Sequence, residues 1–371
     1  MRDPHHFVRL SGLVTLSLSL LSGIAVPAVA QHYKETDLVA DQSGTAATLT
    51  DPNLVNPWGL SRSSGSPWWV SDNGTGLSTL YDGTGAAKAL VVTIPTGDPN
   101  VSTTGTPTGT LFNGSTGFQI AANKPALFLF VTEDGTISGW NPGVNPTNAV
   151  IMVNTKSASV FKGAAFASIT TQAGTSTYLY AADFRKGRVQ IYDSSFKHVS
   201  GGEDAFRDES LPDGFAPFNI QNIGGDLYVA FAKQDSAKHD EVDGAGLGYL
   251  DVFTPSGHLV RRFEHGAWLN GPWAMAMASS DFGVYSHNLL VGQFGSGNIA
   301  VYDAATGRFQ DMLRDASNNP IAIEGLWALS FGSGGGSGPA TSLYFSAGTG
   351  GEQHGTFGTI TPVENTLGNA R

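Results

Sequence analysis

Several short apolar runs of this sequence end in a polar side chain. Asp72 ends WWVSD, Glu133 ends LFLFVTE and Asp183 ends YLYAAD. Carboxylate oxygens are the ligands that Ca²⁺ and other hard divalent cations prefer. If these three carboxylates meet in the fold, they form a cation site, with Ca²⁺ as the first candidate. The alternative is that each accepts hydrogen bonds from backbone N–H groups in the turn that it begins.

The stretch KQDSAKHDEVDGAG (residues 233–246) concentrates further reactive groups. His239 in this stretch, or His354 near the end of the chain, is a candidate acid or base. The carboxylates do not follow the spacing of an EF-hand loop, and the sequence contains neither H-E-x-x-H nor G-x-S-x-G. The stretch is therefore predicted to be a metal-binding loop, a lid or a partner-binding loop, and its sequence does not favour one of the three.

The elements that position these residues are revealed by a repeat. The segment GLSTLY, which begins at Gly76, returns as GTISGW, GRVQIY, GYLDVF, GNIAVY and GTFGTI. Successive copies begin 59, 52, 61, 49 and 58 residues apart. A second apolar segment precedes each copy, and an earlier strand-like segment (NPWGLS, TGFQIA, GAAFAS, APFNIQ, GPWAMA or GLWALS) precedes that one. In most units a fourth segment follows, such as ALVVTI or FQDML.

A repeat of this length with four short strands is typical of a propeller blade. The sequence thus predicts an all-β, six-bladed β-propeller, monomeric by default. The sixth unit is one strand short, and we expect the segment KETDLVAD (residues 34–41) to close the ring as its outer strand, because an open ring would expose strand edges. Trp58, Trp273 and Trp327 are expected to pack between blades.

The N-terminal segment predicts that the protein is exported. Residues 1–30 combine basic residues, a short apolar run and a small-x-small motif, as a signal peptide does. The alternative, a membrane anchor, is disfavoured because the apolar run is short and Ser-rich. We expect residues 31–365 to form the propeller, residues 366–371 a tail, and the mature protein to be periplasmic or extracellular with no membrane-spanning segment.

In a propeller the loops between the second and third strands of each blade share one end of the ring with the segments that enter the first strands. These loops and entry segments define a predicted ligand face made of Asn56, Asp72, Asn73, Glu133, Asp183, Arg185, Lys233, Asp240, Asp243, Gln293 and Glu324.

The charge of the chain narrows the classes of partner. Lys and Arg total 20 against 31 Asp and Glu, for a net charge of −11, which argues against nucleic-acid binding. Two hypotheses remain. The face binds a small molecule, glycan or envelope protein, or it belongs to a cation-dependent hydrolase or lyase of the lactonase type.

The segments DPNLVNPWGL, WWVSDNGTGLSTLYDG, LNGPWAMAMA and IEGLWALSFG resemble an uncharacterised family of exported bacterial proteins related to NHL-type six-bladed propellers. The resemblance extends from about residue 33 to residue 361. Some members carry a PEP-CTERM sorting tail, whereas this chain ends in NTLGNAR. The resemblance implies the fold and an exported location, and it supplies no catalytic residues.

Overall fold

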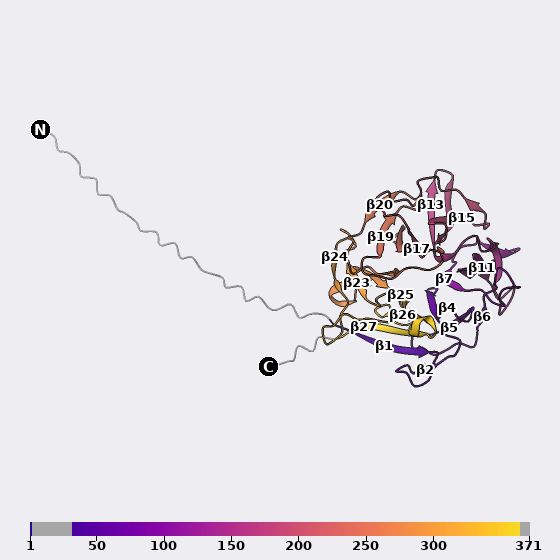
Figure 1. Ribbon diagram of the computed structural model, residues 1–371, viewed down its shortest axis with the longest axis horizontal. Coiled ribbons are helices and arrows are strands. Elements are labelled where there is room, and N and C mark those ends of the chain that lie inside the picture. The colour runs from indigo at the N-terminus through magenta and orange to yellow at the C-terminus, as the bar shows by residue number, and fades with distance from the viewer. Residues whose placement is uncertain (2–31, 364–371) are drawn as a thin grey trace. The chain divides into compact units, whose positions relative to one another are not determined.

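The computed structural model describes Met1 and residues 32–363, and its sheets follow one another around a ring (Figure 1). Five of the six main sheets have four strands and the sixth has five. The described chain is therefore an all-β, six-bladed propeller, as predicted. The predicted signal peptide, the tail and both predicted domain boundaries fall on residues 1–31 and 364–371, which apart from Met1 lie outside the described residues.

Each blade is a meander of antiparallel strands, numbered here in chain order. The strands of blades 1 to 3 are β3 (Pro57–Ser61), β4 (Trp68–Asp72), β5 (Leu77–Tyr81) and β6 (Val92–Thr93); β7 (Pro107–Phe112), β10 (Phe128–Thr132), β11 (Thr136–Trp140) and β12 (Val150–Asn154); and β13 (Phe161–Thr171), β14 (Gly174–Asp183), β15 (Arg188–Tyr192) and β16 (His198–Val199). The strands of blades 4 and 5 are β17 (Phe215–Ile223), β18 (Asp226–Lys233), β19 (Gly248–Phe253) and β20 (Leu259–Arg262); and β21 (Pro272–Met277), β22 (Leu289–Gln293), β23 (Ile299–Tyr302) and β24 (Phe309–Met312).

Blade 6 contains strands from both ends of the described chain. It consists of β25 (Leu326–Phe331), β26 (Leu343–Ala347), β27 (Thr356–Pro362), β1 (Tyr33–Ala40) and the short β2 (Leu49–Thr50). The N-terminal β1 pairs antiparallel with β27, from Tyr33 opposite Pro362 to Ala40 opposite Thr356. Figure 1 shows the indigo β1 beside the yellow β27. The predicted closing strand is thus confirmed as the outer partner of the last repeat.

The second strand of a blade is mainly apolar because neighbouring blades cover both of its faces. Every residue of β4, β10, β22 and β26 is buried. A strand with one face in water would instead alternate between apolar and polar residues. The helical elements are short turns, η1 (Gly283–Tyr285) and α1 (Thr349–Glu352), and none of the helices in the described part is long and apolar enough to cross a membrane.

One predicted strand was wrong. The sequence predicts the first strand of blade 2 at TGFQIA, but that strand is β7, with the sequence PTGTLF. Residues Gln119–Ala121 form β8 instead, which pairs with β9 (Lys124–Pro125) in a small hairpin between the first two strands of the blade. The prediction failed because β7 carries Thr and Gly where the other first strands carry an aromatic residue.

The innermost strand of every blade contains a β-bulge near its start, where it pairs with the end of the second strand. The residues at these six bulges are Trp58, Thr108, Lys162, Phe218, Trp273 and Trp327. A bulge redirects a side chain out of the regular alternation of a strand. Four of these residues pack in one core cluster together with Phe184 and Ala232, so that aromatic rings join blades 1, 4, 5 and 6. The other two bulge positions hold residues that are not aromatic, Lys162 in blade 3 and Thr108 in blade 2.

Candidate functional site

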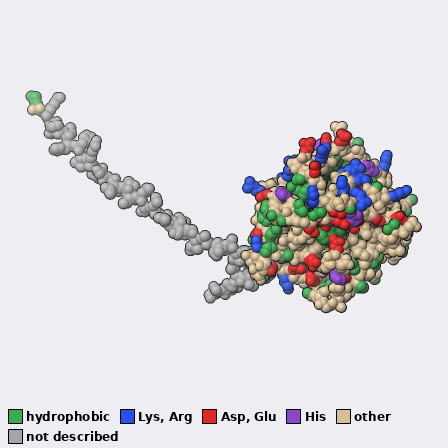
Figure 2. Space-filling view, in the orientation of Figure 1, with side chains coloured by type: hydrophobic (Ala, Val, Ile, Leu, Met, Phe, Trp, Pro, Cys, Tyr) green, Lys and Arg blue, Asp and Glu red, His purple; other side chains and the backbone are tan. Residues whose placement is uncertain are grey.

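Strand pairing brings the predicted loops to one end of the ring. Pro57, at the start of the first strand of blade 1, lies opposite Asp72, at the end of the second strand. The same relation holds in blade 2, where Pro107 lies opposite Thr132. Loops that leave second strands therefore meet segments that enter first strands. In the view of Figure 2, acidic side chains group near the centre of the face that is seen, with His and basic side chains beside them.

A buried ion pair forms the centre of the candidate site. The Nζ atom of Lys162, from the bulge in β13, lies 2.6 Å from Oε1 of Glu133 and 3.0 Å from Oδ1 of Asp240. The Lys162 side chain is 1% exposed, the Glu133 side chain 11% and the Asp240 side chain 62%. The ammonium also lies 4.9 Å from the centre of the Trp58 ring, in cation–π contact. The site thus grades from a buried cation to an accessible carboxylate.

The surrounding charges decide the ionisation of this pair. Burial alone would lower the pKa of Lys162, but the negative charges of Glu133, Glu241 and Asp240 raise it above its ordinary value. The hydrogen bond from His239 and the charge of Lys162 lower the pKa of Asp240. Lys162 and Asp240 are therefore both charged at neutral pH.

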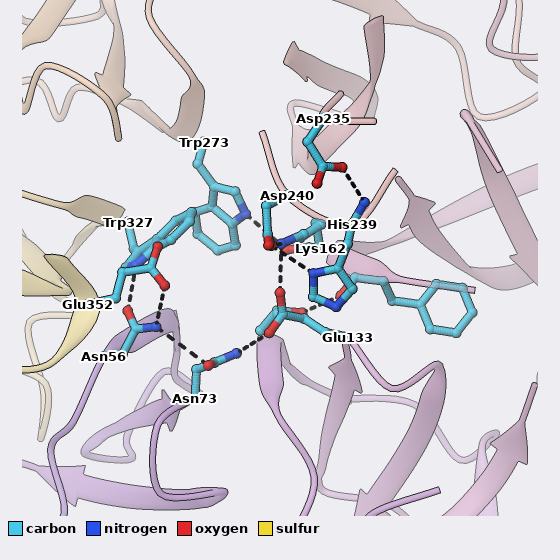
Figure 3. Close-up of polar contacts among 12 residues, drawn as sticks. Asn56, Asn73, Glu133, Lys162, Asp235, His239, Asp240, Trp273, Trp327 and Glu352 are labelled. Carbon is cyan, nitrogen blue, oxygen red and sulfur yellow. Dashed lines mark hydrogen bonds and ion pairs between the residues drawn. The ribbon is translucent and has the colours of Figure 1, made fainter. Parts of the chain in front are cut away.

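A chain of hydrogen bonds extends from Glu133 into blades 1 and 6 (Figure 3). Asn73 Nδ2 donates to Glu133 Oε2 at 2.8 Å, and Asn56 Nδ2 donates to Asn73 Oδ1 at 3.5 Å and to Glu352 Oε2 at 3.1 Å. The indole Nε1 of Trp327 donates to Asn56 Oδ1 at 2.9 Å. Burial, followed by the charge of Glu133, raises the pKa of Glu352. The polar network therefore rests on the aromatic cluster at the axis.

The long loop of blade 4 supplies the other side of the site. The backbone N–H of Val242 donates to the Lys233 carbonyl, and Gln234 forms a β-bridge with Glu241, so the loop is a hairpin. At its turn the backbone N–H of His239 donates to Asp235 Oδ1 at 2.8 Å, and the imidazole Nδ1 lies 2.8 Å from Asp240 Oδ1.

The hairpin also carries groups with displaced pKa values. The hydrogen bond with Asp240 raises the pKa of His239, against its partial burial. Burial raises the pKa of Glu241 to about 8. The pKa values of Glu241 and Asp240 on this hairpin are thus displaced in opposite directions, that of Glu241 by burial and that of Asp240 by its hydrogen bond with His239 and the charge of Lys162.

The predicted cation triad of Asp72, Glu133 and Asp183 does not assemble. Within the described residues, one group of three His, Asp or Glu side chains can place its ligand atoms within 4.8 Å of one another, and that group is Glu133, His239 and Asp240. Asp72 and Asp183 are fully buried within their own blades. Asp72 Oδ2 accepts from the backbone N–H of Thr79, and Asp183 accepts from the Gln190 side chain and two backbone N–H groups.

The three carboxylates do not meet because Glu133 lies one residue further along its blade than Asp72 and Asp183 do along theirs. Asp72 and Asp183 are the last residues of their second strands, and their side chains turn back into the blade. Glu133 is the residue after β10, and its counterpart in blade 1 is Asn73 rather than Asp72. Successive side chains of a strand point in opposite directions. The first loop residue therefore faces the axis where the last strand residue does not.

The remaining predicted residues hold the loops rather than the network. Gln293 is buried and accepts from the backbone N–H of Asn270, Arg185 donates to the Ser157 carbonyl, and Lys233 donates to the Asp213 carbonyl. Asp243 lies beside Gly271 and Gly295. Glu324 accepts from the backbone N–H of Gly351. The imidazole Nδ1 of His354 lies 2.9 Å from Asp41 Oδ2, so this His belongs to the ring closure.

Four residues of the predicted ligand face, Asn56, Asn73, Glu133 and Asp240, lie in this network together with the candidate acid or base His239. Lys162, which also belongs to it, is a residue that the sequence did not single out. A single Lys within the apolar segment VFKGAAFAS was its only signal. Lys residues are almost never fully buried unless they are paired. A Lys inside an innermost strand therefore predicts carboxylate partners from other blades.

Fold and site together define a six-bladed β-propeller with a polar network at one end of its axis. Two proteins of Acanthamoeba polyphaga mimivirus, both called uncharacterized, are each 33% identical to this chain over 306 residues, which is 80% of this chain and 73% and 78% of theirs. The chain belongs to the family of these two proteins. No model of a known protein family matches it. The bacterial family inferred from sequence stays a prediction.

Solved structures agree on the fold. A protein of unknown function from Bacteroides thetaiotaomicron is 10% identical, with a TM-score of 0.56 over 90% of this chain and 77% of its own. A glucose dehydrogenase is 12% identical, with a TM-score of 0.52 over 88% of this chain and 99% of its own. At such low identity these likenesses show the propeller fold alone.

Proposed function

We propose that this protein binds a small polar ligand at the end of the propeller axis that carries Glu133, Lys162, His239 and Asp240. The observation that supports the proposal is convergence: one hydrogen-bonded network contains side chains from blades 1, 2, 3, 4 and 6. Binding sites commonly combine a few precisely placed polar groups with a pre-formed apolar support. The aromatic rings of Trp58 and Trp327 provide that support here.

The gradient of exposure also favours a binding site. Lys162 and Asn56 are buried, whereas the side chains of His239 and Asp240 are 39% and 62% exposed. A ligand can reach the outer groups, and the inner groups hold them in place. A sugar, a short peptide or another molecule with several hydrogen-bond donors would suit the exposed carboxylate and imidazole. We further propose that the protein acts after export, because residues 1–30 have the composition of a signal peptide.

The test is a thermal-shift screen of purified residues 31–371 against sugars, glycans, peptides and polar metabolites. A ligand at a hundredfold excess over its dissociation constant stabilises the native state by about 2.7 kcal/mol. The shift should disappear in His239→Ala and persist in His258→Ala, which alters an exposed His in a turn between the third and fourth strands of blade 4. A ligand that stabilises both variants equally would place the binding site elsewhere.

The second candidate is a cation-dependent hydrolase or lyase. The group that favours it is the triad of Glu133, His239 and Asp240, together with the short contact between His239 and Asp240 that would orient the imidazole as a base. Ca²⁺ or another divalent cation would have to bind where Lys162 already contacts two of the three groups. A loss of stability on treatment with EDTA, restored by one cation, would support this candidate. An unchanged melting temperature would count against it.

A further inference from the structure

The cation position of the only candidate triad among the described residues is already taken. Ligand atoms of Glu133, His239 and Asp240 lie within 4.8 Å of one another, a spacing that allows one ion to contact all three. The ammonium of Lys162 contacts both carboxylates, at 2.6 Å and 3.0 Å. Oxygen ligands lie about 2.3–2.6 Å from a bound Ca²⁺. The ammonium therefore lies close to where an ion would lie.

Charge leads to the same conclusion. Glu133 and Asp240 are the two carboxylates of the triad, and the positive charge of Lys162 offsets one of their negative charges. Hard divalent cations favour sites with several carboxylates, whereas a site with a fixed ammonium repels them. Removing the lysine charge while keeping its length would restore a doubly negative pair beside an imidazole.

The lysine is held firmly in this position. Its backbone carbonyl accepts a hydrogen bond from Trp273 Nε1 at 2.9 Å, and its ammonium lies over the rings of Trp58 and Phe184. The bulge between β13 and β14 directs it away from the regular face of the strand. Because its side chain is 1% exposed, a ligand cannot reach the ammonium directly. Lys162 must act through the carboxylates that it contacts.

We propose that Lys162 is a built-in cation that replaces a metal ion at the axial site. It is a positioning residue: its ammonium contacts both Glu133 and Asp240, and it ties the hairpin of blade 4 to blades 2 and 3 without any bound metal. The inference deepens the proposed ligand site by assigning it to metal-independent recognition. It also predicts that a neutral residue of equal length at position 162 creates a divalent-cation site that the natural protein lacks.

The test compares wild type with Lys162→Met and a matched control, Lys186→Met. Lys186 is also paired with a carboxylate, Asp183 at 3.5 Å, but lies outside the triad. Each protein is titrated with Ca²⁺, Zn²⁺ and Tb³⁺, and Tb³⁺ luminescence is excited through tryptophan. Lys162→Met should bind a cation with a dissociation constant of about 0.1–1 mM or lower, the range of weak Ca²⁺ sites. Trp58 is the expected sensitiser.

Wild type and Lys186→Met should show no saturable signal, and Lys162→Met combined with Glu133→Gln should lose the gained site. Saturable cation binding by wild type that Glu133→Gln abolishes would overturn the inference. A folded Lys162→Met protein that binds no cation would overturn it as well. If Lys162→Met does not fold, Lys162→Gln is titrated in its place, and the titration of wild type still tests whether the natural site binds a cation.

The inference and the proposed function fail separately. A ligand that binds wild type only after a cation is added overturns the built-in cation but keeps the ligand site. A cation site gained by Lys162→Met, in a protein for which the screen gives no ligand, keeps the built-in cation and counts against the proposed function.

Discussion

The indole rings of Trp58 and Trp327 stack with their centroids 3.4 Å apart, and the two residues come from the first and sixth blades. Trp273 of blade 5 meets each of them edge-on, with centroids 6.0 Å away. These rings join blades across the axis at the level of the polar network, which Trp327 Nε1 contacts through Asn56. The packing of these indole rings and the arrangement of the polar network are therefore coupled.

Replacing Trp327 tests this coupling. Trp327 is fully buried, and truncation of a buried Trp to Ala costs about 3–5 kcal/mol. We expect Trp327→Ala to lower the free energy of unfolding by this amount in chemical denaturation. Trp327→Phe should cost less, because it keeps a ring but removes the hydrogen bond to Asn56. Val284→Ala, at a residue that is 60% exposed, should change little. Equal effects of all three changes would contradict the coupling.

The two carboxylates that contact Lys162 should differ in their effect on stability. Glu133→Ala leaves a buried ammonium with an exposed partner only, and breaking a buried pair costs about 3–5 kcal/mol. Asp240→Ala removes a carboxylate that is 62% exposed, and loss of an exposed pair costs about 1 kcal/mol or less. Denaturant unfolding of both variants measures the difference.

A double substitution provides the control for these two variants. Glu133→Ala with Lys162→Met should be more stable than Glu133→Ala alone, because the buried ammonium that keeps only an exposed partner is then removed. If the double variant is the less stable of the two, the ion pair contributes more than the cost of burying its charges.

The repeat made the fold predictable because each blade is encoded locally. The apolar second strand and a glycine at or just before the third strand recur in all six units, and four of these glycines, Gly76, Gly135, Gly187 and Gly297, adopt positive φ. Glycine accesses this region at little cost, so the turn fixes the residue type. The weak unit was blade 2, whose first strand lacks the aromatic residue that marks the others.

The site was only partly predictable because it depends on register. Whether Asp72 or Asn73 faces the axis is decided by which residue pairs last with the first strand, and sequence does not give strand ends to one residue. Lys162 faces the axis because of a bulge that arises from its pairing with β14. The contact of Asp240 with Lys162 depends on how a hairpin of blade 4 lies over blade 3. No local pattern specifies these relations.

Asp251 should make stability depend on pH. It is 2% exposed, and burial, followed by the charge of Asp208, raises its pKa to about 8. An unfolded Asp has a pKa near 3.9, so between about pH 4 and pH 8 the folded state holds the extra proton. Stability contributed by this group is therefore complete below pH 4 and is lost as the pH rises toward 8.

Asp251→Asn mimics the protonated acid and should remove this dependence. We expect the variant to match wild type at pH 4 and to exceed it by at least about 1 kcal/mol at pH 8, since one unit of pKa shift corresponds to about 1.4 kcal/mol. Melting curves from pH 4 to pH 9 measure the effect. Asp204→Asn serves as the control, because the side chain of Asp204 is 90% exposed. A variant that tracks wild type at every pH would show that Asp251 is ionised in the folded protein.

The closing strand β1 should be required for the stability of the whole ring. Tyr33 is 1% exposed, its hydroxyl donates to the Phe282 carbonyl of blade 5 at 2.8 Å, and Val39 and Ala40 are buried at the other end of the strand. We expect Tyr33→Ala to cost about 3–5 kcal/mol, as for other buried aromatic residues, and Lys34→Ala on the exposed side of the strand to cost no more than about 0.5 kcal/mol.

Deleting residues 31–45 should exceed the Tyr33→Ala effect, because the outer edge of β27 would then be unpaired and open to association with other chains. A single cooperative melting transition that shifts as a whole would indicate that the closure supports all six blades. A truncated protein that melts at the wild-type temperature would show that contacts across the axis hold the ring without this strand.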